Sequence, residues 1–300
     1  MRAYLLHMAE TSVFQRTLAA LGPLVPARFR SSIPVVPVVR LSGVIGFSTP
    51  LKPGLSLASV ARSLDRAFEM RNARAVALAI NSPGGSAAQS HLIYRRIRQL
   101  ADEKKIPVIA FVEDVGASGG YMIACSADEI VCDESSIVGS IGVVGGSFGF
   151  EKLIEKLGIE RRLYTSGERK AMLDPFLPEK PEDVERLKAI QKEIHQSFIA
   201  LVQERRGGKL DSRETDLFSG EYWTGNRARE LGLVDAVGDL RATLRERYGE
   251  NVRTPLISDR GLFGRTRPGI GLELWGNHPS LAEDFVSALE ARAIWARYGL

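Results

Sequence analysis

The sequence has no uninterrupted apolar run of the about 18 residues that a membrane-spanning helix requires. It is also poor in metal ligands of the sulfur and imidazole type, with Cys 2 and His 4 in 300 residues. Cys125 and Cys132 form no CxxC pair and have no histidine cluster beside them, which argues against a zinc site. We therefore expect two reduced core cysteines, and neither a metal nor a cofactor.

A large excess of one charge is missing too. Lys+Arg 40 against Asp+Glu 36 leaves a formal net charge of +4. Such a mixed surface differs from the basic footprint of nucleic-acid-binding proteins, so nucleic acid is not an expected partner. The hydrophobic content of 44% is that of an ordinary globular protein and is sufficient for a sizeable core.

The beginning of the chain lacks the apolar run of an export signal, because Glu10, Gln15 and Arg16 interrupt it. Residues 13–30 alternate apolar side chains with three arginines and could rest on a membrane surface. Packing as an amphipathic arm on its own domain or on a neighbouring subunit is the interpretation that we favour. We expect a cytoplasmic protein without a transmembrane segment, with peripheral contact to the inner face of the membrane as an alternative.

Strands and helices are predicted to alternate from residue 33 to residue 143. A proline-interrupted, β-branched stretch at 33–39 indicates an edge strand, and residues 75–80 are fully apolar, as in buried parallel strands. Glycine-rich turns at 81–86 and 116–120 each follow an apolar strand and precede a helical pattern. This order predicts an α/β fold of βαβ units, with both turns facing one crevice at the C-terminal ends of neighbouring strands.

The second half of the chain predicts a strand at 161–165 and a long helix at 181–205 that starts with Pro181. Residues 251–279 are rich in Gly, Pro and Arg without periodicity, and residues 281–297 are amphipathic, as in an oligomerisation or docking helix. We divide the chain into an N-terminal arm at 1–33, a central domain at 34–248, and a connector with the C-terminal amphipathic helix at 249–300.

Ser118 is the first candidate catalytic residue. It follows a buried strand and opens a helical segment, so its hydroxyl would lie beside the free N–H groups of a helix N-terminus. This position favours developing negative charge, as an acyl-transfer nucleophile requires.

The partner of Ser118 remains open on spacing alone. Residues 116–120 match the G-x-S-x-G pattern of α/β-hydrolases, which needs a downstream histidine, but His195 falls within the long helix and His278 within the connector. Lys170 could serve as a general base if burial lowered its pKa towards neutrality. A solvated loop lysine is the alternative, and spacing alone favours it.

Five motifs, in this order, resemble the signal peptide peptidase A family of serine peptidases over about residues 35–245. The resemblance implies the Clp protease and crotonase-like fold, a β-α spiral of repeated ββα and βαβ units, here with a C-terminal helical extension. The central domain at 34–248 would then be the peptidase domain. The motifs are Asn81-Ser82-Pro83-Gly84-Gly85, Gly116-Ala117-Ser118-Gly119-Gly120-Tyr121, Val138-Gly139-Ser140-Ile141-Gly142-Val143, Ser166-Gly167-Glu168-Arg169-Lys170, and Trp223-Thr224-Gly225 with Gly232-Leu233-Val234-Asp235.

The resemblance also implies roles for single residues. Ser118 corresponds to the nucleophile and Lys170, 52 residues further on (170 − 118), to the general base. Ser140 corresponds to the serine that holds the lysine amine, and the backbone N–H groups of Gly85 and Gly119 to the oxyanion hole.

The activity that this implies is that of an endopeptidase with a Ser/Lys dyad, acting on hydrophobic or unfolded peptides that include signal-peptide remnants. Family members form homo-oligomeric rings, in which Lys170 could act on a neighbouring subunit. Many members carry an N-terminal membrane anchor, and we expect none here. A crotonase-like acyl-CoA enzyme and a non-catalytic peptide-binding scaffold are the alternatives.

Overall fold

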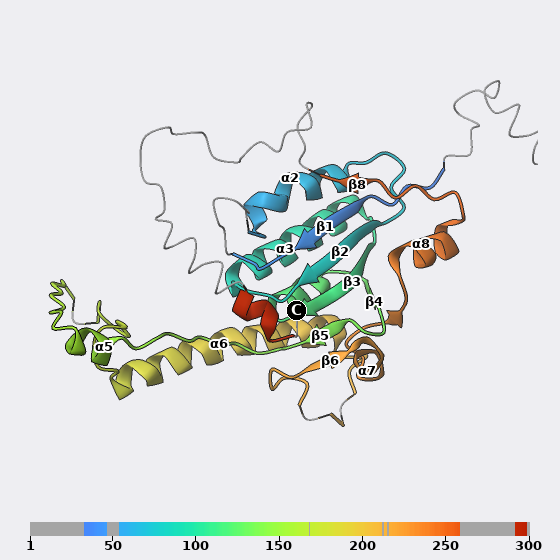
Figure 1. Ribbon diagram of the computed structural model, residues 1–300. Coiled ribbons are helices and arrows are strands. Elements are labelled where there is room, and N and C mark those ends of the chain that lie inside the picture. Colours follow the sequence, from blue (N-terminus) through green and yellow to red (C-terminus); the bar gives the residue numbers. More distant parts are fainter. Residues whose placement is uncertain are drawn as a thin grey trace, which may run out of the picture.

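The computed structural model describes residues 33–46, 54–167, 169–211, 213–214, 216–258 and 292–298 (Figure 1). The predicted N-terminal arm and most of the predicted C-terminal helix lie outside the described residues. Of that helix, residues 292–296 are described and are helical.

One mixed sheet organises the fold, in the order β6-β5-β3-β2-β1-β8 (Figure 1). The central strand β3 (Val108–Ala117) pairs with β4 (Glu129–Cys132) along its first half and with β5 (Ile137–Gly139) along its last residues. All strand pairs are parallel except β5 with β6. This confirms the predicted α/β fold class. The other strands are β1 (Val38–Ser42), β2 (Val76–Ser82), β6 (Tyr222–Thr224), β7 (Ala236–Val237) and β8 (Leu256–Ile257).

Helices cover both faces of the sheet. α2 (Leu57–Phe68) and α3 (Ala87–Lys104) begin at Ser56 and Ser86, whose hydroxyls accept the hydrogen bonds of the first-turn N–H groups. Together with α4 (Gly119–Ala124) they bury the larger hydrophobic cluster, and α8 (Leu240–Tyr248) covers the opposite face. The remaining helices are α5 (Glu151–Lys156), α6 (Pro181–Arg206) and α7 (Gly225–Glu230).

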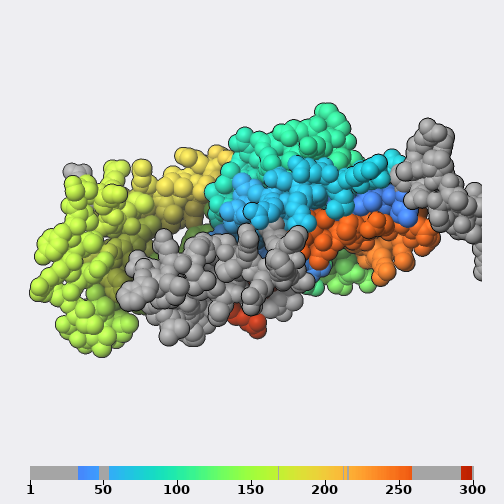
Figure 2. Space-filling view, turned by 90° about the horizontal axis from the view of Figure 1, so that it is seen from above, coloured from blue at the N-terminus to red at the C-terminus, as the bar shows by residue number. Residues whose placement is uncertain are grey.

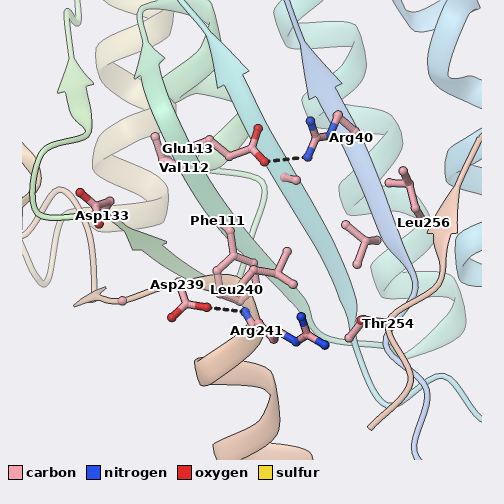
Figure 3. A pocket seen from close by; sticks show the side chains of 13 residues that line it. Arg40, Phe111, Val112, Glu113, Asp133, Asp239, Leu240, Arg241, Thr254 and Leu256 are labelled. Atoms are coloured by element: carbon pink, nitrogen blue, oxygen red, sulfur yellow. Dashed lines mark hydrogen bonds and ion pairs between the residues drawn. The ribbon is translucent and has the colours of Figure 1, made fainter.

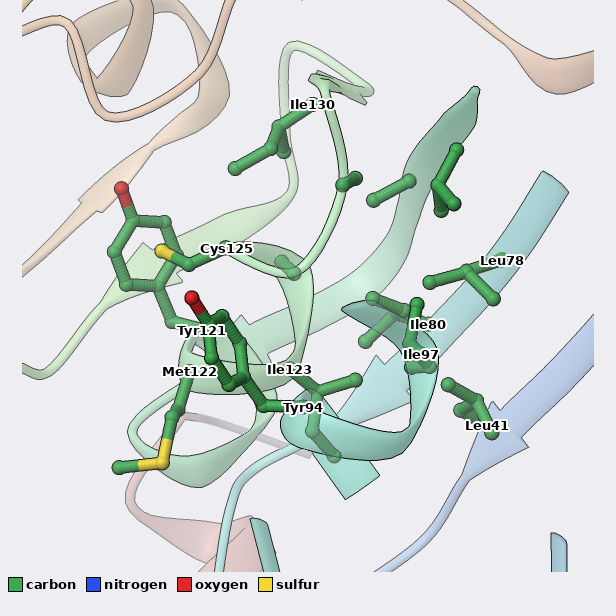
Figure 4. Close-up of a cluster of buried hydrophobic side chains, with 14 of the residues drawn as sticks. Leu41, Leu78, Ile80, Tyr94, Ile97, Tyr121, Met122, Ile123, Cys125 and Ile130 are labelled. Carbon is green, nitrogen blue, oxygen red and sulfur yellow. The ribbon is translucent and has the colours of Figure 1, made fainter. Parts of the chain in front are cut away.

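Tyr121 and the two cysteines belong to the larger cluster. The Tyr121 ring is fully buried and its hydroxyl donates to the Leu233 carbonyl at 2.7 Å (Figure 4). Both cysteines are free and buried, and burial raises the pKa of Cys125 to about 12 and that of Cys132 to about 11. The prediction of reduced core cysteines is confirmed, and a thiol with so high a pKa is a poor nucleophile.

Two strand predictions were wrong, and both errors concern long-range pairing. β1 is not an edge strand, because β8 pairs with it in parallel. β8 lies within residues 251–279, where the sequence shows no periodicity. Residues 161–165 form no strand. They are exposed and have no neighbouring strand with which to pair.

Residues 143–197 form a projecting arm that comprises the segment after β5, α5 and the first two thirds of α6 (Figure 1). None of the described residues of the arm is buried, and it occupies one end of the molecule (Figure 2). Most of the large exposed hydrophobic side chains among the described residues lie on it, although such groups are usually covered. They are Val144, Phe148, Phe150, Leu153, Leu157, Ile159, Leu163, Tyr164, Leu177, Ile190 and Ile194.

A buried ion pair fixes the other end of α6. Arg206 is 3% exposed and contacts Asp235 at 2.7 Å, while two further guanidinium N–H groups donate to the Gly232 carbonyl. Asp235 also accepts from Lys209 at 2.6 Å and from the Ile130 N–H at 2.8 Å. The Gly232-Leu233-Val234-Asp235 motif therefore joins α6 to β4.

Arg206→Met is expected to lower the free energy of unfolding by about 3 kcal/mol, the lower end for breaking a buried pair, because Lys209 remains. Burial raises the pKa of Asp235, but its hydrogen bonds from Arg206 and Lys209 outweigh this and leave the pKa lowered. The stabilisation is therefore full above the ordinary aspartate pKa and is lost as pH falls through the lowered value. Urea unfolding at neutral and acidic pH measures both effects.

The matched control is Arg213→Met, which breaks an exposed pair with Asp211 and should change stability little. If Arg206→Met is as stable as this control at neutral pH, the Arg206–Asp235 pair is not what holds α6.

Candidate active site

Ser118 and Ser140 lie side by side because β3 and β5 end in register. Ala117 pairs with Gly139, and the Ser118 N–H donates to the Gly139 carbonyl at 2.8 Å. Both serines adopt a left-handed φ, 52° for Ser118 and 54° for Ser140, which is uncommon for a residue with a side chain. Two parallel strands thus end in similar strained turns, each of which places a partly exposed hydroxyl at the same edge of the sheet.

Ser118 is the N-cap residue of α4, but its hydroxyl makes no capping hydrogen bond. Its carbonyl accepts the first bond of the helix, from the Met122 N–H at 2.9 Å. The backbone therefore holds Ser118 from both sides while Oγ stays unengaged by the helix. A hydroxyl held in this way can act as a nucleophile.

The loop after β2 closes against the Ser118 turn. A Cβ at Gly84 would lie 2.8 Å from both the Gly119 nitrogen and the Ser118 Cβ, and a Cβ at Gly120 would lie 2.4 Å from the Ser82 carbonyl oxygen. Gly84 also needs its positive φ of 99°. Only glycine lets the two turns approach this closely.

The backbone N–H groups of Gly85 and Gly119 are candidate donors to an oxyanion. Ile45 and Gly85 form an isolated parallel bridge, which uses the Gly84 carbonyl and the Ser86 N–H. Gly119 is the first residue of α4, whose opening N–H groups have no acceptor within the helix. Neither N–H has a hydrogen-bond acceptor among the residues that the structure describes.

Ser140 bonds to two residues from other parts of the chain. Its N–H donates to the Glu221 carbonyl at 2.6 Å, and the Tyr298 hydroxyl donates to Ser140 Oγ at 3.3 Å. Tyr298 packs edge-on against Tyr222, with ring centroids 5.2 Å apart, and Tyr222 donates to the Arg297 carbonyl. The helix at 292–296 accordingly lies over the strand ends near β5 (Figure 1).

Lys170 is not brought to this edge. It lies exposed in the turn between α5 and α6, on the projecting arm, and no contact joins it to Ser118 or Ser140 within the described part of the chain. The structure thus brings together Ser118, Ser140, Gly85 and Gly119, four of the five residues predicted from the sequence, and leaves Lys170 apart.

His195 lies on α6, within the predicted long helix, and its ring has a hydrogen-bond partner. Its Nε2 lies 3.0 Å from the Ile141 carbonyl oxygen. The G-x-S-x-G interpretation needs a downstream histidine as the base, and the bond to Ile141 gives His195 a structural role instead.

Sequence reasoning assigned no role to three residues that shape the site. Gly84 keeps the two turns together, and the doubled glycine after Pro83 was a signal for it. Ile45 forms the bridge to Gly85, and Tyr298 contacts Ser140 from the far end of the chain. Neither of these has a local sequence signal, because both depend on contacts over a long separation.

A separate cavity of about 470 Å³ lies on the face of the sheet that α8 covers (Figure 3). Apolar side chains such as Phe111 and Leu240 line it, with the ion pair between Arg40 and Glu113 at its rim. Ser118 begins a helix that packs in the cluster on the other face, so the cavity is distinct from the serine site.

Two further observations bear on function. Within the described ranges, no group of three or more metal-binding side chains is close enough to hold an ion. None of the described helices is long and apolar enough to cross a membrane.

Comparison with known families places the site in context. Residues 100–250, half of the chain, match the model of peptidase family S49. This range includes Ser118, Ser140 and Lys170.

Relatives differ in length and in name. A protein of Brucella abortus named Na(+)/H(+) antiporter NhaA is 56% identical over 284 residues, which cover 92% of this chain but 38% of that protein. A putative protease of Methanocaldococcus jannaschii is 35% identical over 68% of this chain and 69% of its own. The chloroplastic serine protease SPPA of Arabidopsis thaliana is 36% identical, with 68% of this chain and 30% of that protein covered. The chain thus spans well under half of the first relative.

Proposed function

Because the chain belongs to peptidase family S49, we propose that it is a serine endopeptidase with Ser118 as nucleophile and Lys170 as general base. The observation that carries the proposal is the strained Ser118 turn, in which the Ser118 hydroxyl makes no capping hydrogen bond to the helix. The backbone N–H groups of Gly85 and Gly119 beside it have no acceptor among the described residues. The name of the antiporter relative describes a protein more than twice as long and is not carried over to this chain.

In the proposed reaction, the neutral Lys170 amine takes the proton of Ser118 Oγ, which attacks the peptide carbonyl. The N–H groups of Gly85 and Gly119 stabilise the oxyanion, and one such donor typically contributes about 10²- to 10³-fold in rate. The Lys170 ammonium then protonates the leaving amine. Water releases the acyl group from Ser118 by the same steps in reverse.

Lys170 can act as a base only in its neutral form, and burial in apolar surroundings favours the neutral amine over the ammonium. On a single chain Lys170 is exposed, as are the apolar side chains around it on the projecting arm. A second copy that covered these side chains would bury Lys170 and could receive it beside its own Ser118 and Ser140. We therefore favour a homo-oligomeric ring in which the dyad forms between neighbouring subunits.

The proposed substrates are hydrophobic or unfolded peptides, including signal-peptide remnants. An extended peptide can pair with exposed backbone and present its carbonyl to the serine turn. Peripheral contact with a membrane, through residues 13–30, is part of this proposal.

A crotonase-like acyl-CoA enzyme would use the same pair of N–H groups, but it needs no nucleophilic serine. A non-catalytic peptide-binding scaffold would need neither Ser118 nor Lys170. Reaction of Ser118 with a serine-directed reagent therefore separates the peptidase from both alternatives.

A fluorophosphonate should label the protein at one serine per chain and abolish its cleavage of a fluorogenic hydrophobic peptide. Mass spectrometry of the intact protein and of its peptides locates the label. Ser118→Ala should take up no label, whereas Ser135→Ala, which removes an exposed hydroxyl in the turn before β5, should react like the wild type. Equal labelling of Ser118→Ala, or continued peptide cleavage by it, would overturn the proposal.

A further inference from the structure

His195 lies on α6 at the point where the helix leaves the body of the protein. The residues of α6 before it are unburied, and the buried stretch starts at Phe198. The His195 Nε2 is 3.0 Å from the Ile141 carbonyl oxygen, and since a carbonyl can only accept, the ring donates from Nε2. This side chain therefore connects α6 to the residue directly after Ser140.

We infer that His195 is a positioning residue for the proposed dyad: by holding the Ile141 carbonyl it fixes Ser140 Oγ where the lysine amine must bind. The inference rests on the proposed function and adds a residue to its site. His195 does not contact the reacting atoms. It acts through the loop at 139–142.

Other contacts besides the His195 bond also restrain the loop at 139–142. The Ser140 N–H is held by the Glu221 carbonyl at 2.6 Å, and the Gly142 N–H bonds back to the Ser140 carbonyl at 3.0 Å. The Ile141 side chain is fully buried, and a Cβ at Gly139 would lie 2.8 Å from the Trp223 ring.

Backbone acceptors thus bind the N–H groups of Ser140 and Gly142, and the His195 imidazole binds the carbonyl of Ile141 between them. Without this donor the carbonyl must turn to find water, and because Ser140 has a strained φ of 54°, its hydroxyl would turn as well.

The chemistry of the ring agrees with a structural donor and not with a base. In the neutral form that donates from Nε2, the proton faces the Ile141 carbonyl, so this nitrogen cannot accept the Ser118 proton. A glutamine has an amide nitrogen that can donate in the same direction. His195→Gln is therefore the conservative variant, and His195→Leu removes the donor while keeping an apolar side chain.

His195→Leu is expected to lower kcat for peptide cleavage about 10- to 100-fold, the cost of a misplaced catalytic group, with KM nearly unchanged. His195→Gln should regain most of the rate. His91→Leu, which alters an exposed histidine of α3, is the control and should behave as the wild type. Equal rates for the wild type and His195→Leu, with Ser118-dependent cleavage present, would refute the positioning role.

A double-mutant cycle with Ser140→Ala shows whether His195 acts through Ser140. If it does, His195→Leu lowers the rate in the wild-type background but has little further effect once Ser140 is alanine. If the rate losses of His195→Leu and Ser140→Ala simply multiply in the double variant, His195 supports the fold in general and the inference is overturned.

Hydrogen exchange tests the same idea without any need for activity. The amides of Ser140 and Gly142 should exchange at least about 10-fold faster in His195→Leu than in the wild type and in His195→Gln, because the loop opens more often. Unchanged protection would refute the inference. An absence of Ser118-dependent cleavage in the wild type would instead refute the proposed function, and the exchange result would still decide the role of His195.

Discussion

Ser118→Ala and Lys170→Ala proteins, each about 10⁴-fold or more below the wild type in peptide cleavage, should regain activity when they are mixed. A site shared between neighbours needs an intact Ser118 from one chain and an intact Lys170 from the next. In a mixed ring with one site per interface, about a quarter of the sites would combine the two intact residues. A steady-state assay after unfolding and joint refolding of the two proteins measures the recovery.

Each variant should keep the fold, because neither side chain is used to hold it. Ser118 Oγ makes no capping bond and Lys170 is exposed. Two different affinity tags, one on each variant, show by co-purification whether mixed assemblies have formed. Mixed assemblies without recovered activity would place Lys170 and Ser118 within one chain, and full activity of either variant alone would remove that residue from the mechanism.

Gly84→Ala is expected to lower kcat by about 10²-fold or more, although Gly84 contributes no side chain to the reaction. The new methyl group would meet the Gly119 nitrogen and the Ser118 Cβ, both at 2.8 Å. These atoms belong to the proposed nucleophile and to one oxyanion donor. Because Gly119 N is a backbone atom and Ser118 Cβ is bonded directly to the backbone, no side-chain rotation can relieve the contact. Steady-state kinetics and fluorophosphonate labelling of Ser118 would both report the displacement.

Gly208→Ala is the matched control, because a Cβ at Gly208 meets nothing within 4 Å. It should leave both measurements unchanged. Circular dichroism and urea unfolding separate a displaced turn from an unfolded protein. If Gly84→Ala is folded and fully active, the close approach of the two turns is not needed for the site.

The sequence predicted most of the elements whose signals are local. The apolar spacing of residues 181–205 and the start signal Pro181 predicted the long helix α6, which the structure places at Pro181–Arg206. Ser118 was found because a buried strand followed by small residues and a helix has a recognisable local pattern. Such features depend on residues within one or two turns of each other, so a single sequence suffices for them.

The errors and omissions depend on contacts between distant residues. β8 is only two residues long, and it became a strand because β1 lies beside it. Residues 161–165 have strand-like composition but no partner. The contact of Tyr298 with Ser140 joins residues 158 positions apart, and no periodicity could signal it. The position of Lys170 is the extreme case, because the surroundings that the proposal requires belong to another copy of the chain.

The unburied part of α6 acts as a spacer of defined length. From Pro181 to Ser197 it spans about 25 Å at 1.5 Å per residue. Its sequence could vary widely on the solvent side, but each inserted or deleted residue would rotate the turn that carries Lys170 by about 100° and shift it along the helix axis. Insertions of a whole number of helical turns would keep the orientation of this turn about the helix axis and change only its distance from the body of the protein. Natural variation in this segment should therefore be restricted in length more strongly than in composition, with His195 as an exception.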